Sequence, residues 1–89
     1  MIQATTKSGF YFEINENIGD NMEFLEILSD MKEGDWMAMS KVCEMILGKE
    51  GKKALYDHLR TEDGRVPVVD VSNAIVEIFE AAGKKGKNF

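Results

Sequence analysis

Residues 54–68 read Ala-Leu-Tyr-Asp-His-Leu-Arg-Thr-Glu-Asp-Gly-Arg-Val-Pro-Val, and they predict a helix end, a turn and the start of another helix. Leu55 and Leu59 stand four residues apart, so they lie on one helical face. Asp63-Gly64 is a turn dipeptide, because glycine adopts a positive φ at no steric cost. Pro67 has no N–H and a fixed φ, which suits the first turn of a helix. The stretch therefore predicts a structural hinge between two helices.

Upstream of this hinge, residues 1–14 predict a short β-hairpin. Two runs rich in strand formers, at positions 2–6 and 10–14, flank Lys7-Ser8-Gly9, whose glycine favours a turn. Alternate residues of the second run share one face, which we expect to pack on the helices: Phe10, Phe12 and Ile14. Two strands alone are barely stable in water, so the hairpin needs such a cover.

Four helices are predicted after the hairpin, at residues 20–33, 35–47, 49–61 and 67–83. Asp20 and Asp35 stand where the N-caps of the first two helices are expected. Apolar residues then follow at helical spacing: Phe24, Ile27, Leu28 and Met31, then Met39, Val42, Cys43 and Ile46. The last helix carries its own apolar stripe: Val71, Ile75, Ile78, Phe79 and Ala82. Gly83 is predicted to end it, which leaves residues 84–89 as a frayed basic tail.

A chain of 89 residues makes one domain with a thin core. The expected fold is mainly α, of the α+β class, with a short N-terminal hairpin followed by a compact bundle of about four helices. No apolar run reaches about 18 residues and no signal peptide is visible, so no membrane association is expected. Cys43 is the only cysteine, which indicates a reducing cytoplasm.

The net charge of −5 is unevenly distributed. Eight of the sixteen acidic residues lie between positions 13 and 35, where Lys32 is the only base. This balance argues against binding of duplex nucleic acid, which requires neutralised phosphates. The acidic stretch fits a solvated helical face that aids solubility, and a docking surface for a basic partner is the alternative.

No catalytic or metal-binding constellation is recognisable. His58 is the only histidine and no Ser or Cys can be paired with it from the sequence, so we expect it to be solvated. Cys43 lies on an apolar stripe, where a buried thiol is expected. A calcium loop through Gly64 would place Leu59 at the first ligand position, where it offers no side-chain oxygen. A DNA-reading helix after the turn would lack basic residues. No enzyme activity and no cofactor are therefore expected.

Methionine and tryptophan are the informative residue types. Five of the six methionines fall in the first two predicted helices, where they fill core gaps or, alternatively, form an adaptable patch for a partner. Trp36, the only tryptophan, is expected to cover the core, with a ligand platform as the alternative. The candidate partner-binding residues are Met22, Met31, Trp36, Met37, Met39, Ile75 and Phe79.

The order of these features resembles the tail assembly chaperones of long-tailed phages and prophages of Gram-positive bacteria. The resemblance covers nearly the whole chain, and its segments are residues 8–14, the acidic helix, Gly34-Asp35, Leu47-Gly48, Leu55–Arg60 and Glu62–Val68, with Lys87-Asn88 at the tail. The most specific part runs from Tyr56-Asp57-His58-Leu59-Arg60 to Gly64-Arg65-Val66-Pro67.

This resemblance implies a non-enzymatic role in bacteriophage virion assembly. Such chaperones bind the long, apolar, helical tape-measure protein, keep it soluble and recruit tail-tube subunits around it. They act in the cytoplasm of the bacterial host and are absent from the mature virion. Several are made in two lengths by a frameshift, with which the Gly83-Lys84-Lys85 and Gly86-Lys87 codons are compatible.

A small acidic regulatory adaptor that binds a host or phage protein is the alternative. It predicts a stable monomer with a single partner. The thin core and the open hairpin edge also make self-association into a homo-oligomer an expectation.

Overall fold

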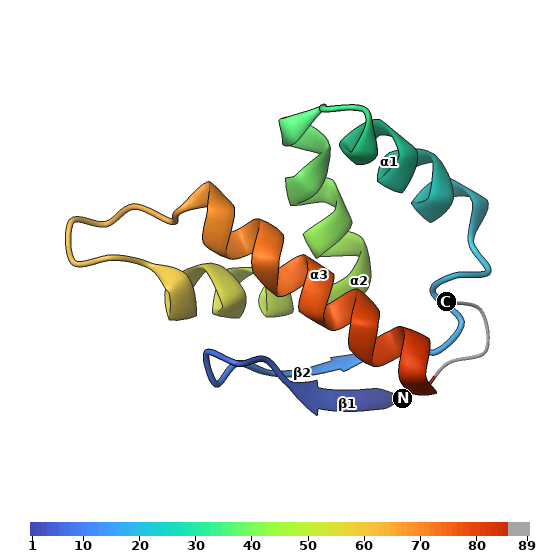
Figure 1. Ribbon diagram of the computed structural model, residues 1–89, viewed down its shortest axis with the longest axis horizontal. Helices are drawn as coiled ribbons and strands as arrows, with labels where there is room; N and C mark the ends of the chain where they lie inside the picture. Colours follow the sequence, from blue (N-terminus) through green and yellow to red (C-terminus); the bar gives the residue numbers. More distant parts are fainter. Residues whose placement is uncertain (86–89) are drawn as a thin grey trace.

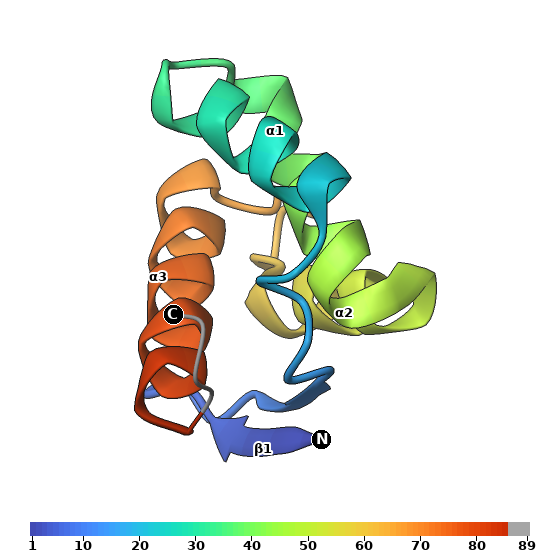
Figure 2. The same ribbon diagram turned by 90° about the vertical axis from the view of Figure 1, so that its right-hand side faces the viewer.

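The computed structural model describes residues 1–85, and the side chains of residues 1–82. Two strands, β1 (Ile2–Thr5) and β2 (Tyr11–Ile14), precede three helices, α1 (Met22–Lys32), α2 (Trp36–Leu59) and α3 (Val68–Lys85). The hairpin and α1 lie at opposite ends of the molecule, with α2 and α3 between them (Figures 1 and 2). The expectation of a hairpin followed by mainly helical structure is confirmed.

The hairpin forms around the predicted turn. β1 and β2 are antiparallel, with Ile2 opposite Ile14 and Ala4 opposite Phe12. Gly9 adopts φ 96°, and its N–H donates to the Thr6 carbonyl at 2.9 Å to close the turn. The apolar face packs inward, with Ile2, Phe12 and Ile14 buried. β1 contacts α3 and β2 contacts α2, so the helices supply the cover that two strands need.

The caps of the first two helices are partly as expected. The prediction of Asp20 as the first N-cap is wrong, because Asn21 holds that place. The Asn21 Oδ1 accepts from the N–H groups of Glu23 and Phe24 at 3.0 and 3.4 Å. Asn and Asp are about equally favourable as N-caps, so the sequence does not show which of the adjacent residues Asp20 and Asn21 takes the position. The backbone conformation decides it. Asp35 caps α2 as predicted and accepts from the Met37 N–H at 3.1 Å.

The helices predicted at 35–47 and 49–61 form one element, so residues 1–85 hold three helical elements where about four were expected. Gly48 lies inside α2 with φ 79° and ψ 171°, a combination essentially restricted to glycine. One such residue bends the chain, and helical structure resumes immediately after it. The predicted break is therefore present as a kink without a loop.

The last helix starts where expected and runs further. α3 begins at Val68, directly after Pro67, and continues through Gly83 to Lys85. The predicted stop at Gly83 is wrong, because glycine inside a helix costs only about 1 kcal/mol and the preceding turn is held by the fully buried Ala82. Residues 84–85 of the predicted frayed tail are helical, and residues 86–89 lie outside the described residues.

The core extends between the elements: α1 packs on α2, α2 packs on α3, and the hairpin packs on α2 and α3. Phe24 of α1 is fully buried, and its ring meets Phe79 of α3 edge-on, with centroids 6.0 Å apart at 76°. The predicted stripes of α2 and α3 supply most of the remaining buried side chains: Met39, Val42, Cys43, Ile46, Val71, Ile75, Ile78 and Ala82. Within residues 1–85, no helix combines the length and the apolarity needed to cross a bilayer.

Candidate functional site

The seven candidate partner-binding residues separate into exposed and buried groups. Met22, Trp36 and Met37 are exposed, at 70, 65 and 81% of their surface. Met31 and Phe79 are half-buried and pack against the core. The other two, Met39 and Ile75, are buried. Ile75 therefore cannot contact a partner directly.

The expectation that Trp36 covers the core is wrong. Trp36 occupies the first residue of α2, where the helix is only beginning to be covered by its neighbours. Met39, almost one turn further along, is 8% exposed and takes the covering position instead. A large indole exposed at a helix end is therefore available to a partner.

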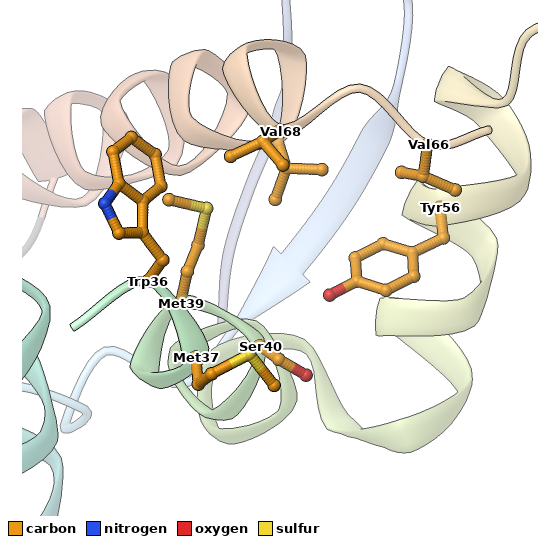
Figure 3. Close-up of a pocket in the computed structure, with 8 residues that line it drawn as sticks. Trp36, Met37, Met39, Ser40, Tyr56, Val66 and Val68 are labelled. Atoms are coloured by element: carbon orange, nitrogen blue, oxygen red, sulfur yellow. The ribbon is translucent and has the colours of Figure 1, made fainter.

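An apolar groove of about 220 Å³ opens beside Trp36 (Figure 3). It is formed by the beginning of α2, the second half of α2, the turn and the beginning of α3. Its lining residues are Trp36, Met37, Met39, Ser40, Tyr56, Val66, Val68 and Val71. We call this feature the groove.

The kink at Gly48 is what forms the groove. The two halves of α2 run in different directions, so Tyr56 projects from the second half across from Ser40 in the first half (Figure 3). In a straight helix these two residues would lie more than four turns apart, about 24 Å along the axis. The wall opposite Trp36 therefore exists because glycine allows the bend.

The groove lining carries two hydroxyls and no charge. Neither Tyr56 nor Ser40 has a side-chain hydrogen bond to another residue among positions 1–85, and the Tyr56 hydroxyl stands at the tip of the projecting ring (Figure 3). A surface of this kind can bury apolar side chains of a partner and still hydrogen-bond one or two of its polar groups.

The hinge holds Val66 and Val68 in the groove. The Thr61 N–H donates to the Arg65 carbonyl at 2.8 Å, and Arg60 Nη1 donates to the Gly64 carbonyl at 2.9 Å. Arg65 also pairs with an acid of the turn, because its Nε lies 2.8 Å from the Asp63 Oδ2.

Asp63 also accepts from the Thr61 hydroxyl, and the hydrogen bonds from Thr61 and Arg65 lower the pKa of its carboxyl. The predicted hinge is therefore a hydrogen-bonded turn.

The groove brings together three of the seven candidates, Trp36, Met37 and Met39. Met22 and Met31 lie on α1, and Ile75 and Phe79 lie further along α3, outside the lining. The sequence prediction missed five lining residues: Ser40, Tyr56, Val66, Val68 and Val71. Of these, Val71 was predicted only as part of the apolar stripe of the last helix. The two valines around Pro67 were a usable signal, since a turn that carries apolar side chains needs something to cover them.

His58 is not simply solvated. Its Nε2 lies 3.1 Å from both the Ser8 hydroxyl and the Ser8 carbonyl oxygen, and its ring packs on Phe10 with centroids 5.7 Å apart. A carbonyl oxygen can only accept, so Nε2 carries the proton and donates. Such a nitrogen cannot act as a base toward Ser8. The pair therefore fastens the hairpin turn to α2.

Cys43 and the possible metal ligands are the other candidates for chemistry in the sequence. Cys43 is fully buried, and burial raises the pKa of its thiol to about 11, which disfavours the thiolate. No cluster of three or more His, Cys, Asp or Glu side chains within residues 1–85 is arranged to hold a metal ion.

Comparisons of the chain with protein-family models, with curated proteins and with solved structures gave no match.

Proposed function

We propose that this protein is a tail assembly chaperone of a long-tailed phage or prophage of Gram-positive bacteria. In this role it binds the tape-measure protein in the host cytoplasm, helps recruit tail-tube subunits and is left out of the mature virion. The proposal is supported by the resemblance of residues 8–14 and 55–68 to that family. The structural observation that carries it is the groove.

The groove suits an apolar helical partner. Trp36, Met37 and Val68 are 65, 81 and 52% exposed around an uncharged lining. Burying an apolar side chain of this size is worth about 1.5–3 kcal/mol, so a few such contacts sustain a specific complex. Methionine also repacks cheaply, which suits a protein that must accept successive segments of a long helix.

The proposed function is tested by co-expression with the tape-measure protein encoded in the same tail operon. The chain is expected to raise the soluble fraction of the tape-measure protein and to purify with it. A tape-measure protein that is soluble yet never captures this chain would contradict the proposal.

A matched pair of variants locates the binding surface. Met37→Glu places a charge in the groove, and Met22→Glu places the same charge on α1, away from it. Both methionines are highly exposed and lie in the first turn of a helix, where glutamate is tolerated. We expect Met37→Glu to abolish capture and Met22→Glu to preserve it; the reverse result would move the site to α1.

A further inference from the structure

A strip of basic side chains continues from the Tyr56 wall of the groove. We call it the basic strip, and it consists of Lys49, Lys52 and Lys53 on the second half of α2 and of Arg60, the C-cap residue that follows the helix. Tyr56 belongs to both surfaces, since it lines the groove and also lies among the residues of the strip. The apolar and the basic surfaces are therefore continuous.

The strip keeps a positive surplus after its internal ion pairs are counted. The four cations share two carboxylates, Glu44 and Asp57, which leaves two unmatched positive charges on a chain whose net charge is −5. Asp57 serves two of the cations, with its oxygens 2.8 Å from Lys53 Nζ and 3.1 Å from Arg60 Nη2. Hydrogen bonds from Lys53 and Arg60 lower the pKa of Asp57, so its single charge is already committed.

The other two cations differ in their surroundings. Lys52 lies 3.8 Å from Glu44 and 5.7 Å above the centre of the Tyr56 ring, so its charge stands at the edge of the groove. Lys49 is exposed and has no ion pair within residues 1–85. The surplus charge is therefore available beside the groove.

We propose that the groove and the basic strip form one docking surface for a helix of a partner protein that carries an apolar face flanked by carboxylates. Apolar side chains of that helix enter between Trp36 and Val68, and its carboxylates reach past Tyr56 to the basic strip. This inference rests on the proposed function and deepens it, because it names the chemistry of the tape-measure segment that binds.

Two observations favour this occupant over others. The groove volume of about 220 Å³ is below the roughly 300–1,000 Å³ of small-molecule sites, so it suits the side chains of a larger partner. The chain as a whole is acidic and would attract a basic partner, but next to the groove the local charge has the opposite sign. A basic flank at that point meets repulsion, and an acidic flank meets complementary charge.

Trp36 allows a direct test, because it is the only tryptophan and lines the groove. The full chain is titrated with two stapled helical peptides of about 18 residues, a length that is marginal as a free helix in water. They share one tryptophan-free apolar face and carry either glutamate or lysine along one flank. We expect the glutamate peptide to shift Trp36 emission to the blue and to bind more tightly, with an affinity that falls as salt is added.

Equal or tighter binding of the lysine peptide would overturn the inference. Binding of the glutamate peptide without any change in Trp36 emission would also overturn it, because the contact would then lie elsewhere.

Charge-neutralising variants test the basic strip itself. The double variant Lys49→Gln, Lys53→Gln removes two charges from the strip, and Lys32→Gln, Lys41→Gln removes two charges outside it. We expect the first variant to bind the glutamate peptide roughly three- to tenfold more weakly and the second to bind normally. Equal losses in both variants would show that only net charge matters and would contradict the inference.

The outcomes also separate this inference from the proposed function. If the peptides show the preference but the tape-measure protein is never captured, the docking chemistry stands and the chaperone function fails. If the tape-measure protein is captured equally well by both double variants, the function stands and the docking chemistry fails.

Discussion

At the scale of single residues, His58 shows how a polar side chain can fix the position of an element. It joins the hairpin turn to α2 across 50 residues of sequence, through hydrogen bonds to Ser8 and ring contact with Phe10. Ser8 and His58 are both exposed, so the link contributes modestly to stability. It adds to the packing of the hairpin's buried apolar face against α2 and α3.

His58→Ala removes both the hydrogen bonds and the ring contact. We expect it to lower the free energy of unfolding by about 1–2 kcal/mol, measured by urea denaturation. His58→Phe keeps a ring against Phe10 and loses only the hydrogen bonds, so it should lose less. A stability for His58→Ala that equals the unmodified chain would show that the hairpin is held by its apolar face alone.

Cys43 gives the stability a pH dependence at alkaline pH. Burial raises its thiol pKa from 9.0 to about 11, so between these values the unfolded chain releases a proton that the folded chain retains. Stability from this group is fully present below pH 9 and is lost as the pH rises toward 11. Denaturant titrations between pH 9 and 11 should show a decline in the free energy of unfolding, and Cys43→Ala should remove part of this decline. An identical decline in the variant would mean that other groups cause it.

At the scale of elements, Gly48 decides the shape of α2. Alanine cannot adopt φ 79° and ψ 171° without strain, so Gly48→Ala is expected to destabilise the fold by about 1–3 kcal/mol. The variant should also weaken binding in the groove, because Tyr56 depends on the bend. Lys49→Ala, at the next exposed position, should leave unfolding unchanged. A more stable Gly48→Ala would indicate that α2 straightens without loss, since alanine favours continuous helix by about 1 kcal/mol.

The elements could largely be predicted from the sequence, and their ends could not. The hairpin, the Asp35 cap and the helix start after Pro67 follow from local chemistry that leaves little choice. Gly48 and Gly83 show the limit. Both lie inside a helix, but Gly48 bends α2 whereas α3 continues through Gly83. Whether a helix continues through a glycine depends on tertiary packing of its neighbours, such as the burial of Ala82. The glycine itself has no side chain from which that packing could be predicted.

The candidate site was less predictable for a related reason. Trp36 and Met37 are sequence neighbours at a helix start, and their exposure could not be inferred from a helical pattern that begins there. Tyr56 reaches the groove only through the kink, and Val68 only through the hinge. Apolar periodicity predicts which residues are buried, but it carries no information about how far apart two elements stand.

At the scale of the whole molecule, Phe24 connects α1 to the rest. It is fully buried and meets Phe79 of α3 edge to face. Phe24→Ala should cost about 3–5 kcal/mol through lost burial and a cavity, out of a total on the order of 5–13 kcal/mol for a chain of this length. Leu25→Ala, at a 43% exposed neighbour, is the matched control and should cost far less. Equal losses of stability in the two variants, measured by thermal or urea unfolding, would show that α1 adds little to the core.

The contact between β1 and α3 joins the earliest and the latest elements of the described chain. During translation, β1 leaves the ribosome before α3, so the contact of its inner face, which carries Ile2, with α3 forms only after α3 has been made. The β2 side of the hairpin can already pack on α2 by then, so the marginal hairpin is half covered, and α3 completes the cover.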